Sequence, residues 1–355
     1  MATLLDVREH IPLARFTTFG VGGPARYFAE IKSEQQLIEA LEFAQKRGLP
    51  TFVLGGGSNL IVSDTGFAGV VLQIGMRGIC SRDVVLSAQK RLFSVAAGEE
   101  WDAFVSRTVA DNCAGVECLS GIPGLVGGTP VQNVGAYGQE VAETIQTVRV
   151  YDHASRDFVD LSNPDCGFSY RTSIFNSTQR DRYIVTSVTF ALSLSGDASI
   201  RYADVKRVFP DGSHPSLAEV RAAVLKIRAA KGMVIDPADP DSRSAGSFFK
   251  NPILTNSEFA VRRSRLDAVG KPYSTYPAGD GHVKLSAAWL IESAGFHRGY
   301  GDGRVGISSK HTLALINRGG ATAADVLSFA RRVQDGVRAH FDIDLHPEPV
   351  MLGFD

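Results

Sequence analysis

The residues from Gly121 to Gly138 combine glycines with polar side chains in a pattern that suits anion binding. The segment GIPGLVGGTPVQNVGAYG holds six glycines and two prolines, a density that excludes a helix or an ordinary strand. Glycines allow positive φ angles and close backbone approach, so the amides of this run can point at a bound, anionic group. Hydrogen-bonding side chains are interspersed at Thr129, Gln132, Asn133 and Tyr137. The alternative is a glycine-rich surface loop.

A second glycine turn, from Gly55 to Leu60, reads GGGSNL. It lacks the Lys-Ser/Thr ending of a P-loop, and Leu60 stands where a Rossmann fingerprint has its third glycine. Successive amides of such a turn can hold a phosphate, with Ser58 and Asn59 as side-chain donors. A tight turn that joins two strands explains the same residues.

A third segment, SAGSFFKNP from Ser244 to Pro252, places a serine between small and aromatic residues. The small residues before Ser247 leave its hydroxyl exposed to a ligand, whereas Phe248 and Phe249 can anchor the segment in a core. Taken alone, Ser247 is most simply a turn hydroxyl. Its interest comes from its combination with the two glycine segments.

Length and composition set the class of protein. A chain of 355 residues exceeds the usual size of a single core, so we expect two or three domains. The net charge of −1 gives no argument for binding nucleic acid or an anionic membrane. No run of about 18 apolar residues is present, and the start of the chain lacks the layout of a signal peptide. We therefore expect a cytoplasmic protein, monomeric, without nucleic-acid or membrane partners.

The cysteines and histidines do not suggest a metal. The four cysteines, at positions 80, 113, 118 and 166, show no zinc-type pairing, and we expect them to be reduced thiols. The histidines are scattered and form no ligand spacing such as His-x-x-x-His. The sequence therefore predicts no metal site.

Strand and helix patterns lead into the glycine segments. Residues 27–31 read as a strand, followed by a helix with a capping box at Ser33 and Gln36 and a stop at Gly48. Residues 51–54 form a strand that runs directly into Gly55. Further strands are predicted at 70–74, 92–97, 145–151 and 183–192, and a helix at 101–113. The predicted buried positions of the two helices are Leu37, Ile38, Leu41 and Ala44, then Phe104, Val105, Val109 and Ala110.

A cluster of turn residues at 209–215 predicts a domain boundary. A helix then opens at Ser216 with Glu219 and ends near Gly232. Another is predicted at 287–293, and a last one begins near Thr322. The inward positions predicted for the first and last of these helices are Val220, Ala223, Val224 and Ile227, then Val326, Ala330, Val333, Val337 and Phe341.

Taken in order along the chain, these segments resemble the MurB family, the UDP-N-acetylenolpyruvoylglucosamine reductases of bacterial cell-wall synthesis. Any one glycine run is a weak signal, but the order and separation of the segments make the resemblance specific. It covers nearly the whole chain and rests on seven segments: TFGVGG at 18–23, GGGSN at 55–59, the run 121–138, Tyr170-Arg171, the run 246–252, AWLIE at 288–292, and Pro347-Glu348.

The resemblance implies an α+β fold with a two-subdomain, FAD-binding part of the sugar-oxidase (PCMH-like) type and a C-terminal, substrate-binding α+β domain. We place the boundaries at 1–66, 67–213 and 214–355. It also implies a reaction in which NADPH reduces FAD and the enolpyruvyl group of UDP-N-acetylglucosamine enolpyruvate is then reduced to give UDP-N-acetylmuramate for peptidoglycan. The resemblance further implies that NADPH and the sugar nucleotide use one cleft in turn, which fits the absence of a Rossmann fingerprint.

The resemblance assigns three catalytic residues. Hydride addition to the enolpyruvyl group builds negative charge on the carboxylate and the adjacent carbon, and Arg171 would neutralise it. Ser247 would deliver the proton to that carbon, and Glu348 would assist at the same intermediate, hydrogen-bonded and in a protonated form. Each residue also has a simpler explanation. Arg171 could be a surface arginine that pairs with an acid, Ser247 a turn serine, and Glu348 a solvated acid near the C-terminus.

The resemblance also assigns ligand contacts. Lys231 and Asn251 would bind the substrate diphosphate, and Tyr202 would belong to the loop that closes over substrate in the tyrosine-loop subtype of the family. Tyr202 could instead be part of an exposed strand end. The predicted FAD contacts lie in the two glycine segments: Gly55, Gly56, Gly57, Ser58, Asn59, Leu60, Gly121, Ile122, Pro123, Gly124, Gly127, Gly128, Gln132, Asn133, Gly135, Ala136 and Tyr137.

Two further points qualify the resemblance. Neither flavin segment contains histidine or cysteine, so we expect noncovalent FAD. Pro349 follows Glu348 where the family commonly has valine, which removes one amide donor and favours an extended backbone at Glu348. A flavin oxidase of the same fold is the alternative enzyme, and a flavin-binding protein without turnover is the alternative class. Ser247, Arg171 and Glu348 together favour the reductase.

Overall fold

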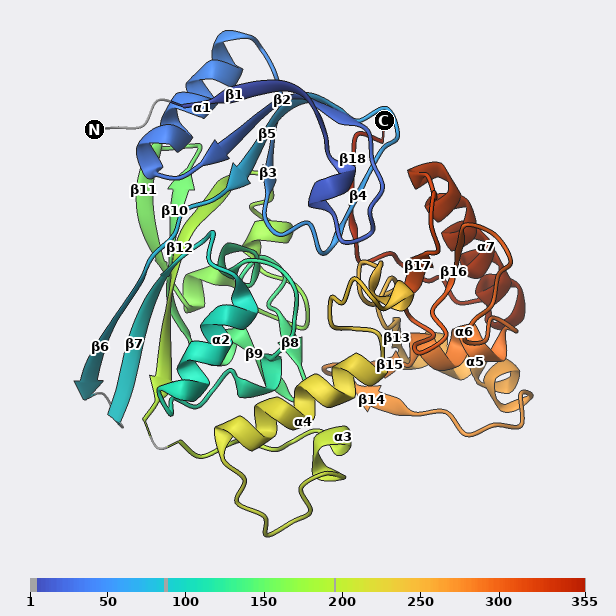
Figure 1. Cartoon of the computed structure of the whole chain (residues 1–355). Coiled ribbons are helices and arrows are strands. Elements are labelled where there is room, and N and C mark those ends of the chain that lie inside the picture. Colours follow the sequence, from blue (N-terminus) through green and yellow to red (C-terminus); the bar gives the residue numbers. More distant parts are fainter. Residues whose placement is uncertain (1–4, 86–88, 195, 355) are drawn as a thin grey trace. The chain divides into compact units, whose positions relative to one another are not determined.

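The computed structural model describes residues 5–85, 89–194 and 196–354, and the chain divides into two compact units (Figure 1). The first unit contains residues up to Ile11, Ala25–Gly56 and Ala68–Ala230. The second contains Pro12–Pro24, Gly57–Phe67 and the chain from Lys231 onward. Two short N-terminal segments thus group with the C-terminal third of the chain. The three-part functional division at residues 66 and 213 stays a prediction.

The first unit begins with a four-stranded sheet in the order β1-β2-β5-β3. Its strands are β1 (Val7–Pro12), β2 (Pro24–Ile31), β5 (Phe67–Ile74) and β3 (Thr51–Leu54), and β3 pairs with β5 in parallel. Helix α1 (Glu34–Lys46) connects β2 to β3. Its Ser33 cap accepts a hydrogen bond from the amide of Gln36, and the Gln36 side chain accepts one from the amide of Lys32.

The second sheet of this unit has the order β11-β10-β12-β7-β6, with antiparallel pairing throughout. Helix α2 (Trp101–Ala110) packs on it, since Trp101 and Phe104 contact Phe190 at ring-centroid distances of 5.8 and 5.0 Å. These aromatic side chains are fully buried. The strands are β6 (Ile79–Val85), β7 (Gln89–Ala96), β10 (Ile145–Asp152), β11 (Asp157–Ser162) and β12 (Tyr183–Ser193).

The remainder of the first unit surrounds the predicted flavin segment. A hairpin pairs β8 (Gly135–Ala136), in the C-terminal part of the run 121–138, with β9 (Gln139–Glu140), directly after it. Helices α3 (Ala203–Lys206) and α4 (Leu217–Ala230) close a small apolar cluster around Cys118. Short 3-10 turns connect these elements: η2 (Glu117–Leu119), η3 (Val126–Gly128), η4 (Val141–Glu143), η5 (Pro164–Cys166) and η6 (Ile174–Asn176).

The second unit packs three helices around a core of its own. Helix α7 (Ala323–Phe341) buries all five side chains of its predicted stripe. The other helices are α5 (Asn256–Asp267) and α6 (Ala287–Ser293), with the 3-10 turns η1 (Ala14–Phe16) and η7 (Pro240–Ser242). The strands are β4 (Leu60–Val62) paired in parallel with β18 (Val350–Leu352), the sheet of β13 (Ile253–Thr255), β15 (His282–Leu285) and β14 (Thr275–Pro277), and the pair β16 (Val305–Ile307) and β17 (Leu315–Asn317).

Most predicted elements are confirmed, with corrections at their ends. The helix predicted at 101–113 ends at Ala110, and Ala110 itself is exposed, so its assignment to the buried side was wrong. The reason is that Asp111 and Asn112 already leave the helix, Asn112 with a φ of 53°. Helix α5 and the strands β6 and β11 were not predicted. None of the helices in the described part of the chain is long and apolar enough to cross a membrane.

Candidate functional site

Gly56, at the start of the glycine turn 55–60, meets the glycine run 121–138 inside the first unit. A Cβ atom added to Gly56 would lie 2.6 Å from the Cα of Gly124, far closer than such atoms approach. Two backbone segments that are nearly 70 residues apart in sequence therefore touch at a point that only glycine permits. This contact supports the prediction that the two segments act together.

Other glycines of these segments border open space. A Cβ atom at Gly55 or Gly128 would meet no described atom within 4 Å, and neither residue has a positive φ. Among the described residues, no backbone hydrogen bond uses the amide of Gly55 or Gly56 as its donor. Backbone amides that lack internal acceptors, next to space that a side chain would fill, suit the phosphates of a dinucleotide. The residues present therefore fit FAD.

The start of the glycine run is fixed by an ion pair that the sequence did not suggest. Asp102 of α2 accepts the amide of Gly121 at 2.6 Å and a two-pronged contact from Arg221 of α4 at 2.6 and 2.7 Å. Burial raises the pKa of Asp102, but the hydrogen bonds from Arg221 and Gly121 outweigh it, so that the pKa is lowered overall. Nearby, burial lowers the pKa of Arg228, which a hydrogen bond to Tyr137 opposes.

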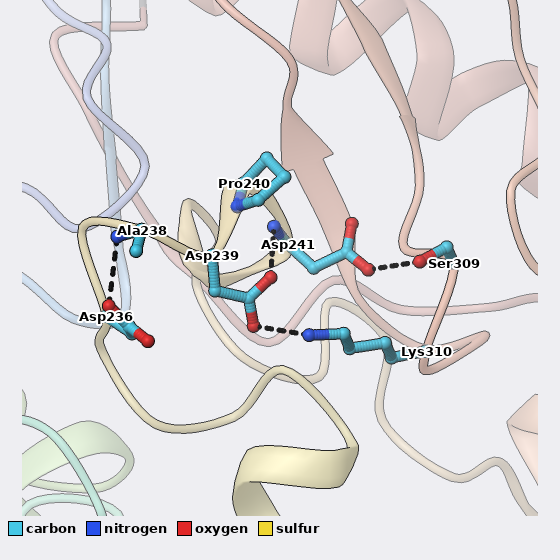
Figure 2. A pocket seen from close by; sticks show the side chains of 7 residues that line it. All are labelled: Asp236, Ala238, Asp239, Pro240, Asp241, Ser309 and Lys310. Carbon is cyan, nitrogen blue, oxygen red and sulfur yellow. Dashed lines mark hydrogen bonds and ion pairs between the residues drawn. The ribbon is translucent and has the colours of Figure 1, made fainter.

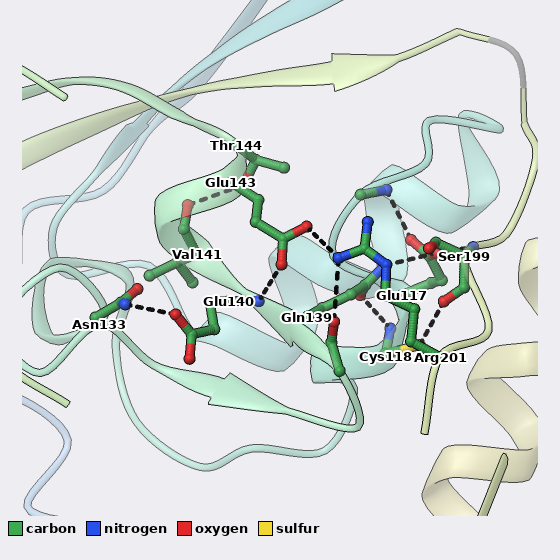
Figure 3. A network of polar contacts seen from close by, with 12 residues as sticks. Glu117, Cys118, Asn133, Gln139, Glu140, Val141, Glu143, Thr144, Ser199 and Arg201 are labelled. Atoms are coloured by element: carbon green, nitrogen blue, oxygen red, sulfur yellow. Dashed lines mark hydrogen bonds and ion pairs between the residues drawn. The ribbon is translucent and has the colours of Figure 1, made fainter. Parts of the chain in front are cut away.

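The end of the glycine run is held by a polar network (Figure 3). Asn133 is buried, with a φ of 44°, and its side chain donates to Glu140 at 2.8 Å and to the Ser169 carbonyl at 3.0 Å. Its side-chain oxygen accepts the Ala142 amide at 3.2 Å. The side chain of Asn133, a predicted FAD contact, is thus used inside the protein, and its amide also donates to the Pro130 carbonyl at 3.4 Å.

Glu117 forms the second half of this network. Its fully buried carboxylate accepts hydrogen bonds from the Gly115 amide at 2.7 Å, from Gln139 at 2.8 Å and from the Ser199 amide at 3.3 Å. Arg201 bonds Glu143 at 3.0 Å and the Gly138 carbonyl at 3.5 Å. The segment that leads to Tyr202 is therefore fastened to the glycine run.

Tyr202 itself remains accessible. It is 47% exposed, caps the first turn of α3 and meets Tyr137 edge-on at a centroid distance of 5.6 Å. Tyr202 precedes a helix, so the alternative of an exposed strand end is wrong. Its role in substrate binding stays a prediction.

Arg171 lies against the glycine run in the same unit. Its guanidinium donates to the Asn133 carbonyl at 3.1 Å and to the Gly135 carbonyl. These contacts use two of its five N–H donors. Its φ is 103°, a conformation that costs roughly 1–3 kcal/mol for a residue with a side chain. Its hydrogen-bond partners are thus backbone carbonyls of the glycine run, and its catalytic role stays a prediction.

The segments that carry Ser247 and Glu348 pair with each other in the second unit. The amide of Glu348 donates to the Phe248 carbonyl at 2.8 Å, and the amide of Lys250 donates to the His346 carbonyl at 3.0 Å. Phe248 and Phe249 are buried, as predicted, whereas Ser247 and Glu348 are partly exposed. This antiparallel pairing, between Phe249 and Pro347, brings together two segments that are far apart in sequence.

The predicted diphosphate residues are also in the second unit. Asn251 accepts the Ala287 amide at 2.9 Å and so caps α6. Lys231 lies near His311, since burial and then the positive charges of Lys231 and Arg298 lower the pKa of His311 to about 4. The capping role of Asn251 and the position of His311 near Lys231 could not be predicted from the sequence, because the partners are distant along the chain.

A surface pocket of about 340 Å³ lies between η7 and residues 309–310 (Figure 2). Its polar groups bind one another: Lys310 contacts Asp239 at 2.8 Å, Ser309 contacts Asp241 at 2.6 Å, and Asp236 accepts the Ala238 amide at 2.9 Å. None of its residues is among those predicted to act in catalysis. Within the described residues, no group of three or more His, Cys, Asp or Glu side chains could hold a metal ion.

Two family models match the chain. One describes the C-terminal domain of UDP-N-acetylenolpyruvoylglucosamine reductase and matches residues 237–352. The other describes an FAD-binding domain and matches residues 25–161. The UDP-N-acetylenolpyruvoylglucosamine reductase of Thermobifida fusca is 53% identical over 351 residues, which are 97% of this chain and 98% of that protein.

The chain belongs to the UDP-N-acetylenolpyruvoylglucosamine reductase (MurB) family.

Other MurB relatives agree. The reductase of Streptomyces coelicolor is 49% identical and covers 99% of this chain and 92% of its own length. The crystal structure of MurB from Thermus caldophilus matches with a TM-score of 0.66 at 26% identity and covers 98% of this chain and 100% of its own. The predicted α+β fold, with an FAD-binding domain followed by the MurB C-terminal domain, is confirmed.

Proposed function

We propose that this chain is an FAD-dependent reductase that uses NADPH to convert UDP-N-acetylenolpyruvoylglucosamine into UDP-N-acetylmuramate, a precursor of peptidoglycan. Family membership supports the reaction. The structural observation that supports the proposal is the backbone pairing of the Ser247 segment with the Glu348 segment, an isolated bridge between Phe249 and Pro347 with a hydrogen bond from the Glu348 amide to the Phe248 carbonyl. Both side chains are partly exposed, so both can reach a ligand.

When it is bound, FAD supplies hydride transfer from NADPH to the substrate. The chain's part is to hold it, noncovalently, with the backbone of the two glycine segments. The contact at Gly56 and Gly124, and the open space beside Gly55 and Gly128, support this role. The other predicted contacts of the two segments, among them Ser58, Gln132, Asn133 and Tyr137, complete the proposed set.

Arg171 has the charge and the geometry for the substrate carboxylate. Because two carbonyls of the glycine run hold its guanidinium, the remaining N–H donors are oriented before substrate arrives. A preorganised donor of this kind stabilises the negative charge that hydride addition creates. The positive φ at Arg171 is consistent with a residue whose position matters more than its local stability.

Ser247 gives up the proton of its hydroxyl to the carbon next to the substrate carboxylate, so one O–H bond breaks as one C–H bond forms. The serine oxygen then recovers a proton from solvent. Glu348, protonated and hydrogen-bonded, assists at the charged intermediate. With the hydride, this proton completes the reduction of the double bond, and one NADPH and one proton are consumed for each substrate.

The remaining residue roles concern the sugar nucleotide. Lys231 and Asn251 contact the diphosphate, and Tyr202 closes over the substrate, which assigns the chain to the tyrosine-loop subtype. We also propose a cytoplasmic monomer in which two FAD-binding parts, 1–66 and 67–213, are followed by a substrate-binding part, 214–355. Analytical ultracentrifugation of the holoprotein tests the monomer.

The test of the function begins with the absorbance spectrum of the purified protein. We expect a flavin band that is released by heat or acid, because the cofactor is noncovalent. NADPH oxidation should then depend on added UDP-N-acetylenolpyruvoylglucosamine and yield UDP-N-acetylmuramate. A protein that stays colourless after incubation with FAD contradicts every flavin function, and one that reduces oxygen while it oxidises a sugar favours the oxidase alternative.

A further inference from the structure

The TFGVGG segment, residues 18–23, has no role in the proposed mechanism. In the second unit its Phe19 and Val21 side chains are buried, which explains their apolar character. Thr18 is different, because it is only partly buried and its side chain is directed to another backbone segment. The Thr18 hydroxyl donates to the Ser244 carbonyl at 2.6 Å.

This hydrogen bond fixes one end of the segment that carries Ser247. Ser244 lies three residues before Ser247, and the amide of Phe248, directly after it, donates to the Leu313 carbonyl at 2.7 Å. Between the two anchors lies Gly246, with a φ of 72° and no described atom within 4 Å of a Cβ placed there. The Gly246 amide donates to the Ser244 hydroxyl at 3.2 Å, a bond within the segment that does not tie it to the rest of the unit. The position of Ser247 therefore depends on its anchors.

The anchor at Thr18 is itself well supported. The amide of Thr18 donates to the Gly57 carbonyl at 3.2 Å, which connects Thr18 to the glycine turn 55–60. Asn317 holds the next residue, since its side chain donates to the Phe19 carbonyl at 2.9 Å. The Asn317 amide donates to the Arg243 carbonyl, also at 2.9 Å. Hydrogen bonds on both sides of Thr18 thus fix its position, and the Thr18 hydroxyl in turn binds the Ser244 carbonyl.

The glycine turn 55–60 also forms hydrogen bonds with the segment that contains Glu348. The Asn59 side chain donates to the Glu348 carbonyl at 3.4 Å, and the Asn59 carbonyl accepts the Val350 amide at 2.9 Å. Pro349, between them, has no amide to donate. Thr18 and residues 57–59 therefore contact the segments that carry Ser247 and Glu348.

We propose that Thr18 is a positioning residue for the proton donor Ser247, acting through the Ser244 carbonyl. The inference rests on the proposed function, since it presupposes that Ser247 delivers a proton. A proton is transferred over a short distance, so a displacement of Ser247 by about 1 Å can slow that step on the order of 100-fold. NADPH-driven flavin reduction needs no carbon acid and is insensitive to this displacement.

The test compares Thr18→Val with Thr18→Ser in the flavin-loaded enzyme. Valine keeps the branched shape and deletes the hydroxyl, whereas serine keeps the hydroxyl. In stopped-flow measurements, we expect T18V to leave flavin reduction by NADPH within about twofold of wild type and to slow reoxidation by the substrate about 10-fold or more. T18S should restore reoxidation. Hydrogen–deuterium exchange, followed by mass spectrometry, should show faster exchange in residues 243–250 of T18V alone.

The outcomes separate the inference from the function. If the wild-type enzyme does not reduce the substrate, the proposed function fails. If the wild type does and T18V reoxidises at the wild-type rate, or both half-reactions slow equally, the positioning role is wrong. If T18V does not fold, Thr18→Ala takes its place in the same comparison. If neither T18V nor Thr18→Ala folds while T18S does, Thr18 is needed for the stability of the fold, and the inference is overturned.

Discussion

At Arg171 the backbone adopts a φ of 103° while the guanidinium is held by two carbonyls of the glycine run. Replacement by alanine removes the proposed donor to the substrate carboxylate, and we expect substrate reduction to fall about 10²- to 10³-fold with flavin reduction by NADPH unchanged. The matched control is Arg156→Ala, an exposed arginine that also has a positive φ, of 59°. Equal activity of the two variants would contradict the assignment of Arg171.

His311 gives a residue-level test of electrostatics. Burial, followed by the charges of Lys231 and Arg298, lowers its pKa from 6.5 to about 4. Above pH 6.5 the histidine is neutral in both states. As the pH falls from 6.5 to 4, the unfolded chain binds a proton that the folded chain does not, so the free energy of unfolding decreases, by at most about 3 kcal/mol.

His311→Gln should remove most of that decrease. The measurement is chemical denaturation of wild type and variant at several pH values between 4 and 7.5. If the free energy of unfolding changes with pH in the same way for wild type and variant across this range, the pKa of His311 is not lowered.

Single residues show where reading the sequence succeeds and fails. The local pattern around Ser247 correctly predicted that Phe248 and Phe249 are buried, but Ser247 itself was singled out only through its combination with the other segments. Asn133 was correctly placed in the glycine run, yet its side chain bonds the Ser169 carbonyl 36 residues away. Asn251 caps a helix that begins at Ala287. Such long-range partners leave no local signal.

At the scale of elements, the two glycine segments can be tested by adding single methyl groups. Gly56→Ala would place its Cβ 2.6 Å from the Cα of Gly124, so we expect it to lower both stability and FAD affinity. Gly55→Ala meets no described atom within 4 Å and should leave the stability of the apoprotein unchanged. If the cofactor fills that space, G55A should still weaken FAD binding, about 10-fold or more.

Thermal unfolding of the apoproteins and fluorescence titration with FAD provide the two readouts. Gly303→Ala, also in open space but in the other unit, is the control for an unrelated glycine. Unchanged FAD affinity in G55A would show that the cofactor does not pass close to Gly55.

Helix prediction depended on end signals combined with an apolar face. Helix α7 was predicted well because Thr322 caps it and its buried side chains recur every three to four residues. Helix α5 has a complete capping box at Thr255 and Glu258, but Leu266 is its one buried residue among those described. Without an apolar stripe, its pattern resembles that of a polar loop. The short strands of the second unit, three or four residues each, were missed for lack of length.

At the scale of the whole molecule, the sequence order hides how the units are assembled. Residues 12–24 and 57–67 group with the C-terminal chain because β4 pairs with β18 and because Asp64 accepts the amides of Ala323 and Ala324, at 2.7 and 3.0 Å, at the start of α7. A division drawn at single positions along the chain cannot express this grouping.

The thiols give a prediction for the whole chain. Burial raises the pKa of Cys118 and of Cys166 to about 12 and also raises that of Cys113, whereas Cys80 is exposed. Because the thiolate is the reactive form, we expect iodoacetamide at pH 8 to modify Cys80 alone in the folded protein. Peptide mass spectrometry gives the site, with the urea-unfolded protein as the positive control. Rapid labelling of Cys118 or Cys166 would show that these regions open readily.

The most direct measurement of the central claim is a stopped-flow comparison of the two half-reactions in Ser247→Ala. We predict that NADPH reduces the flavin of this variant within about twofold of the wild-type rate. Reoxidation of the reduced enzyme by UDP-N-acetylenolpyruvoylglucosamine should slow about 10²- to 10⁴-fold, the range expected for loss of a positioned acid. Reoxidation at the wild-type rate would contradict the role of Ser247 as the proton donor.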